Sequence, residues 1–499
     1  MKLVCVQILR AALLLSILFA SFTVHTADQF VYTNNDIQGP NKVLGFRVGA
    51  YGTLSEIVGS PFPTAGSGGD GLSYFASNRI VISAPGGFLY ASNSGSNDVS
   101  AFSIDPSSGN LTPVPGSPFP LDGFGPGSGG ISLAVTPNGQ FLMAGNPLSE
   151  RITSFSIGRD GSLTTAPGSP FFAGGQPSGM KVSPNGKFLA AGLLGGVAMF
   201  SIAPDGSLTA VQGSPFGQGG VGAAAGVDVN CKSNLLFAGE ANASGITIVD
   251  VFRIASDGVL ASITGSPFVA EAGANSNVPL LSADERFLFV SNQEAVTLPS
   301  STGTVTVFSI AADGTLTLVP ASPFPAGGFP SGMATNPAGT LLFTGNDQAI
   351  GVLSIANDGT LTAVPGSPFS AAQPLSSLKS LAAFPSKTCE IPVDIDVKPG
   401  GSRNRINLGS KGVVAVAVLS SPSFNPGNVM VDTVRISGAS PVKFTYKDVN
   451  SDGVADLVLH FHTQDLHLTA SSTEVTLTAK LRNGRSITGT DSVRIVPRN

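Results

Sequence analysis

One phrase recurs along this chain: Asp-Gly, an apolar residue, Thr, and then Gly-Ser-Pro-Phe, as in PDGSLTAVQGSPFGQ at residues 204–218. The prolines of its Ser-Pro-Phe core follow one another at intervals of 45 to 57 residues: Pro61, Pro118, Pro170, Pro215, Pro267, Pro323 and Pro368. Self-similarity at such a period is typical of a solenoid or of a β-propeller, in which each repeat is one four-stranded blade. The seven copies predict seven similar structural units.

The repeat at residues 177–216 shows how four strands would fit into one unit. SGMKVS predicts an innermost strand of small residues, and PNG predicts a tight turn, because Pro presets φ and Gly accepts a positive φ. KFLAAGL and GVAMFSI predict the next two strands, and Asp205-Gly206 turns the chain into SLTAVQ, the fourth strand. No later segment shows a helical period, so we expect an all-β fold.

The Ser-Pro-Phe core itself is interpreted as scaffold. A proline on the outer edge of the fourth strand offers no N–H to a neighbouring sheet, which protects that edge from aggregation. We expect Phe216 and its six equivalents to fold back as wedges between blades. The Asp-Gly pairs are interpreted as turn residues and not as metal ligands.

The two ends of the array predict how it closes. Residues 29–32 match the second strand of a blade, whereas residues 378–384 match an innermost strand. One end lacks the strand that the other has spare. We therefore predict a seven-bladed β-propeller closed by its C-terminal strand, which removes the open ends of a solenoid.

The first 27 residues predict a signal peptide. Lys2 and Arg10 precede the apolar run ALLLSILFASF, and a small residue, Ala27, marks a plausible cleavage point. The apolar run is shorter than the ~20 residues of a membrane-spanning helix. We expect a secreted, periplasmic or cell-surface protein without a membrane span.

The charge of the chain limits its possible binding partners, and its cysteines raise the question of a disulfide. The formal net charge is −5 with the signal peptide, whose two positive charges are then lost, so no basic patch suits nucleic acid. Cys231 and Cys389 remain in the exported chain. Export permits a disulfide, but the two lie in distant repeats, so we expect them to be unpaired.

Residues 89–104, LYASNSGSNDVSAFSI, resemble the Tyr-Val-Thr-Asn type of propeller repeat found in exported microbial proteins. The succession of Phe-Ser-Ile, Asp-Gly, Leu-Thr and Gly-Ser-Pro-Phe is similar to the lactonase family of seven-bladed propellers, relatives of 6-phosphogluconolactonase. The resemblance covers residues 29 to about 385. It implies the propeller fold and, as an activity, lactone hydrolysis.

The sequence departs from the enzymes of that family at the axial cleft. There the family places Arg-His pairs at the start of some innermost strands, where this chain has residues 177–180 (PSGM), 330–333 (PSGM) and 129–131 (GGI). Its four histidines lie outside the ring: His25, His460, His462 and His467. Lactone hydrolysis at neutral pH needs a group that exchanges protons, usually a histidine or a shifted carboxylate.

The absence of histidines from the ring favours a binding or surface-display protein without catalytic machinery. Its propeller face would bind a small molecule, a glycan or a protein. One alternative is a lactonase-like hydrolase or cycloisomerase acting on a sugar or carboxylate lactone. Another is a structural envelope or matrix component. The lack of tryptophan weakens a sugar-stacking role.

Residues that break the repeat are the better site candidates. An asparagine recurs near the end of the second strand and is interpreted as structural: Asn34, Asn93, Asn146, Asn292 and Asn346. Glu240 replaces it in one blade and Glu294 follows it in another. Together with Arg79 and Arg151, these are the residues expected in any catalytic or binding cluster. The alternative is that all four are solvated loop charges.

A second domain follows the ring. Composition and period change after Phe384, which predicts a propeller over 28–385, a linker over 386–392 and a β-sandwich over 393–499. The Val-Asp-Ile-Asp-Val-Lys-Pro-Gly start resembles an accessory domain of exported bacterial and archaeal proteins.

The segment KDVNSDGVADLVL within this domain predicts a calcium loop. Asp448, Asn450 and Asp452 occupy loop positions 1, 3 and 5, the Val454 carbonyl position 7 and Asp456 position 9. Gly453 makes the sharp turn. Leu459 stands where a helical EF-hand has glutamate, so we expect a strand-flanked loop like those of thrombospondin or integrin. The alternative is an acidic hairpin without an ion.

His460 and His462 share one face of the following strand. A transition-metal site there is conceivable, but we expect both side chains to face solvent.

Overall fold

A computed structural model describes residues 28–36, 38–69, 78–83, 87–121, 130–217, 226–241, 244, 246–271, 278–292, 303–346, 349–370, 380–386, 389–401, 404–421, 424–482 and 486–496. The predicted signal peptide and Glu294 lie outside these residues. Among the described residues, the regular elements are strands and three short 3-10 turns, Ala50–Gly52, Pro426–Asn428 and Thr463–Asp465. Within the described part of the chain, no helix has the length and apolar character needed to cross a membrane.

Seven antiparallel sheets share one pattern of four strands, as the repeat predicts. The innermost strands are β34 (Leu381–Phe384), β5 (Ile80–Ser83), β10 (Ser132–Val135), β15 (Met180–Val182), β19 (Gly226–Val229), β24 (Pro279–Leu281) and β29 (Gly332–Thr335). The second strands are β1 (Gln29–Asn34), β6 (Phe88–Asn93), β11 (Phe141–Asn146), β16 (Phe188–Leu193), β20 (Leu235–Ala241), β25 (Phe287–Asn292) and β30 (Leu341–Gly345). The third strands are β2 (Gly39–Val48), β7 (Asp98–Ile104), β12 (Arg151–Ile157), β17 (Gly196–Ile202), β21 (Thr247–Ile254), β26 (Thr304–Ile310) and β31 (Ala349–Ile355). The fourth strands are β3 (Leu54–Glu56), β8 (Leu111–Pro113), β13 (Leu163–Thr165), β18 (Leu208–Ala210), β22 (Leu260–Ser262), β27 (Leu316–Leu318) and β32 (Leu361–Ala363).

The ring closes as the two ends of the array predict. Strand β34 pairs with β1, with Phe30 opposite Phe384 and Tyr32 opposite Ala382. Seven hydrophobic clusters, one between each pair of neighbouring blades, hold the ring together, including one between the seventh blade and the first. The prediction of a seven-bladed propeller closed by its C-terminal strand is confirmed.

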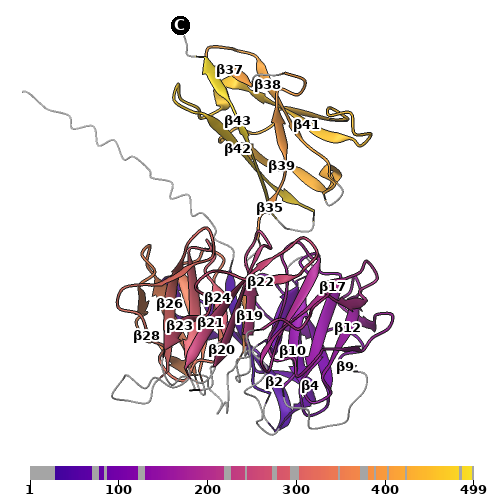
Figure 1. Ribbon diagram of the computed structural model, residues 1–499, viewed down its shortest axis with the longest axis vertical. Helices are drawn as coiled ribbons and strands as arrows, with labels where there is room; N and C mark the ends of the chain where they lie inside the picture. The colour runs from indigo at the N-terminus through magenta and orange to yellow at the C-terminus, as the bar shows by residue number, and fades with distance from the viewer. Residues whose placement is uncertain are drawn as a thin grey trace, which may run out of the picture.

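Two faces of the ring are used below. At the linker face, each innermost strand turns into its second strand, and the chain leaves β34 toward the C-terminal sheets (Figure 1). At the far face, each second strand turns into its third strand.

The Ser-Pro-Phe motif does not sit on the outer strand as expected. The chain turns back after the fourth strand, and the phenylalanine begins a short segment that pairs with the third strand: β4 (Phe62–Gly68), β9 (Phe119–Pro120), β14 (Phe171–Phe172), β23 (Phe268–Glu271), β28 (Phe324–Pro325), β33 (Phe369–Ser370) and the single bridge at Phe216. The serine hydroxyl accepts the third-strand N–H that neighbouring strands leave free, as Ser214 Oγ does from Met199 at 2.9 Å. The phenylalanines pack between blades, as predicted.

The Asp-Gly turn also joins blades. Gly206 has a φ of +84°, and a Cβ atom there would lie 2.5 Å from the ring of Phe141 in the preceding blade. The Asp205 carboxylate accepts the backbone N–H of Ser207. These pairs are therefore turn residues, and the glycine is required both by its backbone angle and by the aromatic ring beneath it.

The C-terminal residues form a β-sandwich. One four-stranded sheet contains β35 (Ile391–Pro392), β43 (Ser486–Ser492), β42 (Glu474–Leu481) and β39 (Val429–Ile436). The other contains β36 (Ile395–Val397), β38 (Val413–Val418), β41 (Asp456–His462) and β40 (Lys443–Lys447), and a small third sheet pairs β37 (Arg405–Asn407) with β44 (Arg494–Val496). Both larger sheets contribute to one core, where Val416 and Leu459 meet Leu477 and Ile487.

The expectation of two unpaired cysteines is wrong. Cys231 and Cys389 form a disulfide, with their Cα atoms 5.2 Å apart. Cys231 lies at the linker face in the turn between β19 and β20, and Cys389 lies in the segment after β34. Distance along the chain misled the prediction, because a closed ring returns its last strand to the neighbourhood of blades that are remote in sequence.

Candidate functional site

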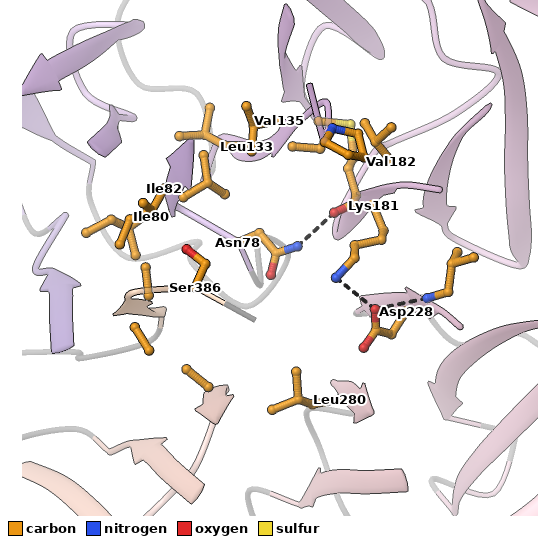
Figure 2. A pocket seen from close by; sticks show the side chains of 18 of the residues that line it. Asn78, Ile80, Ile82, Leu133, Val135, Lys181, Val182, Asp228, Leu280 and Ser386 are labelled. Carbon is orange, nitrogen blue, oxygen red and sulfur yellow. Dashed lines mark hydrogen bonds and ion pairs between the residues drawn. The ribbon is translucent and has the colours of Figure 1, made fainter. Parts of the chain in front are cut away.

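A cavity of about 310 Å3 lies on the axis of the ring, enclosed by the innermost strands (Figure 2). Its walls are mainly aliphatic and include Ile80, Ile82, Leu133, Val182 and Leu280. The volume falls at the lower end of the range for small-ligand sites, about 300–1,000 Å3. The innermost strands supply this lining, because their residues are mostly small or aliphatic.

Two charged side chains interrupt this lining. Lys181, the middle residue of β15, reaches Asp228 of β19, and the Nζ–Oδ1 distance is 2.9 Å (Figure 2). The Lys181 side chain is 42% exposed, whereas that of Asp228 is 7% exposed. Asp228 also accepts the backbone N–H groups of Val229 and of Leu281 in the next blade. The carboxylate is thereby fixed between two blades, and it orients the lysine.

Each end of the cavity has a polar boundary. Asn78, which precedes β5 of the second blade, donates its side-chain amide to the Met180 carbonyl of the fourth blade at 2.8 Å. At the linker face, Ser386 and Cys389 contribute to the wall. The disulfide therefore fixes one side of the cavity opening.

Glu240 stands at the far face with a second carboxyl beside it. It is the last residue but one of β20 and lies opposite Ile248, while Asp250 lies opposite Ala238 on the same side of the sheet. Both side chains are 2% exposed. Burial, followed by the charge of Asp250, raises the pKa of Glu240 to about 7. Burial also raises the pKa of Asp250, although the Ser266 hydroxyl donates to it.

The other blades place neutral groups at these two positions. In the second blade, Asn93 donates its amide to Ser100 Oγ at 2.8 Å, and in the sixth blade Asn292 donates to Thr306 Oγ1 at 2.8 Å. The asparagines are structural, as expected. The fifth blade replaces the amide and the hydroxyl with two carboxyl groups, so Glu240 and Asp250 are a specific feature of that blade.

Arg79 serves the closure of the ring. It precedes β5, is 1% exposed, and lies 3.4 Å from the Asp36 carboxylate of the first blade. Its backbone N–H donates to Ser380 Oγ, beside the closing strand. Burial raises the pKa of Asp36, and the nearby guanidinium opposes that rise. The arginine therefore joins the first and second blades at the far face.

The structure does not bring together Arg79, Arg151 and Glu240, the three sequence-predicted residues that it describes. Arg79 and Glu240 both lie at far-face strand ends but belong to the second and fifth blades. Arg151 begins β12 of the third blade and is exposed, as a solvated charge would be. Glu294 lies outside the described residues.

Sequence reasoning missed Lys181 and Asp228. The signal was present, because these are the only charged residues on the seven innermost strands of the described ring. Their meeting depends on two neighbouring blades, and the repeat alone does not show which side chains cross between blades.

The predicted calcium loop joins β40 to β41. Asp448 accepts the backbone N–H groups of Ser451 and Gly453, and Asp452 accepts that of Val454. Gly453 has a φ of +87°, as the sharp turn requires. The pKa of Asp452 is lowered, mainly by its bond from the Val454 N–H. The loop thus holds side-chain oxygens at the alternate positions 448, 450 and 452, and Asn450 and Asp452 are exposed.

Asp456 has a different place in this loop. Its side chain is fully buried, and its two oxygens accept the backbone N–H groups of Ser420 and Val449 at 2.8 and 2.9 Å. It therefore braces the loop against the neighbouring strand. His462 is exposed and His460 is half-buried.

Seven four-stranded blades around an axial cavity define this chain as a seven-bladed propeller. Residues 21–169 and 249–374, more than half of the chain, match the sequence profile of the family described as "Lactonase, 7-bladed beta-propeller". The chain belongs to this family. Lys181, Asp228 and Glu240 lie in the stretch between the two matched segments.

Solved structures support the same fold. A candidate 6-phosphogluconolactonase from Bacteroides fragilis is similar with a TM-score of 0.55 and 22% identity, over 72% of this chain and 99% of that one. Another from Bacteroides uniformis has a TM-score of 0.53 and 20% identity, over 70% and 98%. The periplasmic gluconolactonase PpgL of Pseudomonas aeruginosa has a TM-score of 0.51 and 19% identity, over 70% and 99%. No curated protein sequence matches significantly.

Proposed function

We propose that this protein is a lactonase-type hydrolase that opens a sugar or aryl lactone with Glu240 as the general base. Membership of the lactonase family favours this alternative over the non-catalytic display role that the missing histidines suggested. The similar structures named for 6-phosphogluconolactonase and gluconolactonase activity support the same choice of substrate class.

The observation that carries the proposal is the state of Glu240. A general base works best when its pKa lies near the working pH. Burial next to Asp250 raises the pKa of Glu240 to about 7, so the carboxylate can take up and release a proton at neutral pH. In this proposal, Glu240 supplies the proton exchange that histidines provide in other enzymes of the family.

In the proposed reaction, the Glu240 carboxylate accepts a proton from water as the water oxygen bonds to the lactone carbonyl carbon. The ring C–O bond then breaks, and the leaving oxygen receives the proton from Glu240. The product is an open-chain hydroxy acid, and no oxidant or second substrate is consumed.

The test is turnover on a panel of sugar and aryl lactones by the full chain. Glu240→Gln keeps the shape of the side chain and removes its basicity, so we expect at least a hundredfold loss of kcat. Glu474→Gln, on an exposed position of β42, is the matched control and should retain full activity. Lack of turnover on every lactone, or an active Glu240→Gln enzyme, would overturn the proposal. Either result would favour a binding protein or a structural component instead.

We also propose that the loop at 448–456 binds calcium, with Asp448, Asn450, Asp452 and the Val454 carbonyl as ligands and Asp456 as its brace. Hard oxygen donors at alternate positions suit Ca2+. The exposed, ionised Asp452 supports this assignment. We further propose that the N-terminal segment directs export of the protein. The disulfide between Cys231 and Cys389 is compatible with an oxidising compartment.

A further inference from the structure

Strand β40 of the C-terminal sandwich is a free edge strand. The order in its sheet is β36-β38-β41-β40, and among the described residues β40 pairs with β41 alone. Every residue of β40, whose sequence is KFTYK, is exposed. An edge strand presents backbone N–H and C=O groups that can pair with another chain. The strand is therefore open to a further strand at its edge.

One face of β40 is apolar. Val442, Phe444 and Tyr446 alternate along the chain, so their side chains point to the same side of the sheet, and they are 52%, 50% and 45% exposed. Phe444 lies opposite Leu459 of β41, and Tyr446 lies opposite Leu457. Both leucines are fully buried in the core of the sandwich. The apolar face of β40 thus continues the core beyond the cover of the opposing sheet.

The other face of β40 carries positive charge. Lys443 and Lys447 stand at the two ends of the strand, with Thr445 between them. Among the described residues, no carboxylate forms a salt bridge with either lysine. The next carboxylate along the chain, that of Asp448, accepts two backbone N–H groups of its own loop instead. The two lysines are therefore available to an acidic partner.

This combination of an open edge, an apolar face and a basic face selects the partner. When an extended segment adds to a sheet edge, the backbone hydrogen bonds supply affinity and the alternating side chains supply specificity. Acidic residues opposite Lys443 and Lys447 would form favourable cross-strand pairs, and apolar residues between them would cover Phe444 and Tyr446.

Two other occupants fit this surface less well. In an antiparallel pairing of two copies of β40 centred on Thr445, each Lys443 would lie opposite a Lys447, and like charges directly opposite destabilise a sheet. A sugar would lack a flat platform, because the rings of Phe444 and Tyr446 meet edge to face at 84°.

We propose that β40 is a docking site for an extended segment of a partner protein, in which acidic residues alternate with apolar ones and which adds to the sheet as a further strand. The site lies in the C-terminal sandwich. It does not rest on the proposed hydrolysis or on the calcium loop.

The test is binding of the labelled peptide GEITVEG to the full chain at low ionic strength, measured by fluorescence anisotropy. We expect it to bind about tenfold or more tightly than GKITVKG, because the lysines of β40 meet opposite charges in the first peptide and like charges in the second. GEPPVEG should not bind, since its adjacent prolines remove backbone N–H groups on both sides of an added strand. No binding of GEITVEG, equal binding of GKITVKG or equal binding of GEPPVEG would overturn the proposal.

Reversal of the charges locates the binding. Lys443→Glu with Lys447→Glu should reverse the preference, so that GKITVKG binds about tenfold more tightly than GEITVEG. Lys411→Glu with Lys480→Glu is the matched control, which makes the same change of charge at exposed lysines of the same domain outside β40. It should leave the preference unchanged. An equal shift in both double variants would show attraction to net charge and would overturn the assignment to β40.

The apolar face is tested by Phe444→Ser with Tyr446→Ser, which should weaken binding of GEITVEG about tenfold or more. Unchanged binding in this variant would overturn the proposal, and the charge reversal remains a test if the variant does not fold. Sedimentation of the full chain without peptide tests the second copy as occupant. A dimer that the same double variant abolishes would replace the foreign segment with a second chain and would overturn the proposal.

Discussion

Glu240 and Asp250 project from the same side of the fifth blade, and one residue pair of the β20–β21 ladder, Gly239 and Val249, lies between them. Burial is the main cause that disfavours ionisation of Glu240, and the charge of Asp250 adds to that effect. The pKa of Glu240 is raised from 4.5 to about 7 as a result. This arrangement has a consequence for stability as well as for catalysis.

We predict that Glu240 makes the ring less stable as pH rises from about 4.5 to about 7. Over that range the folded state holds a proton that the unfolded state releases, so the free energy of unfolding falls with pH. Glu240→Gln should remove about 2–3 kcal/mol of this fall. Urea unfolding of both proteins at pH 5 and pH 8 measures it. An equal fall in both proteins would contradict the shifted pKa.

Gly206→Ala should destabilise the ring by about 3 kcal/mol or more, since a new Cβ meets Phe141 and the backbone angle is left-handed. Gly186→Ala is the matched control. Gly186 has a φ of +75° and nothing within 4 Å of its Cβ position, so that change should cost only about 1 kcal/mol. If both variants lost the same free energy of unfolding, measured by heat or urea, the contact with Phe141 would not be the reason for the repeated glycine.

Removal of the disulfide by Cys231→Ser with Cys389→Ser should lower the free energy of unfolding by about 2–5 kcal/mol. The bond joins residues 158 apart in sequence and closes a long loop of the unfolded chain. Unfolding of the oxidised protein, the reduced protein and the double variant gives the comparison. The reduced protein should match the double variant, and a double variant as stable as the oxidised chain would contradict the prediction.

Calcium at a hundredfold excess over its Kd should stabilise the C-terminal sandwich by about 2.7 kcal/mol. The loop carboxylates repel one another unless a cation lies among them. The unfolding transition of the full chain with calcium and with a chelator tests this, and Asp452→Ala should abolish the difference. An acidic turn without an ion would unfold at the same midpoint in both conditions.

The repeat fold could be predicted from the sequence because its determinants are local. Each blade is specified by alternating apolar residues and by turns such as Asp205-Gly206, which act over a few residues. The closing pair of β34 and β1 was also predictable, since each end of the array reveals the strand that it lacks or carries in excess. The place of Ser-Pro-Phe was not, because pairing with the third strand requires the chain to reverse after the fourth.

Part of the candidate site could be predicted in the same way. Glu240 breaks a recurring asparagine position, so the sequence singles it out. Its partner Asp250 replaces a hydroxyl on the adjacent strand, and that substitution has a meaning only once the strand register is known. The proton affinity of Glu240 follows from burial, which is a property of the packed blades and not of the local sequence.

The sequence by itself determined the all-β class, the seven repeats and the closure of the ring, because short-range patterns specify strands and turns. Only the tertiary structure decided that Cys231 bonds to Cys389 and that Lys181 meets Asp228 on the axis. These contacts join different blades or a blade and the linker. Closure of the ring decides which side chains face one another there, and no local pattern encodes that geometry.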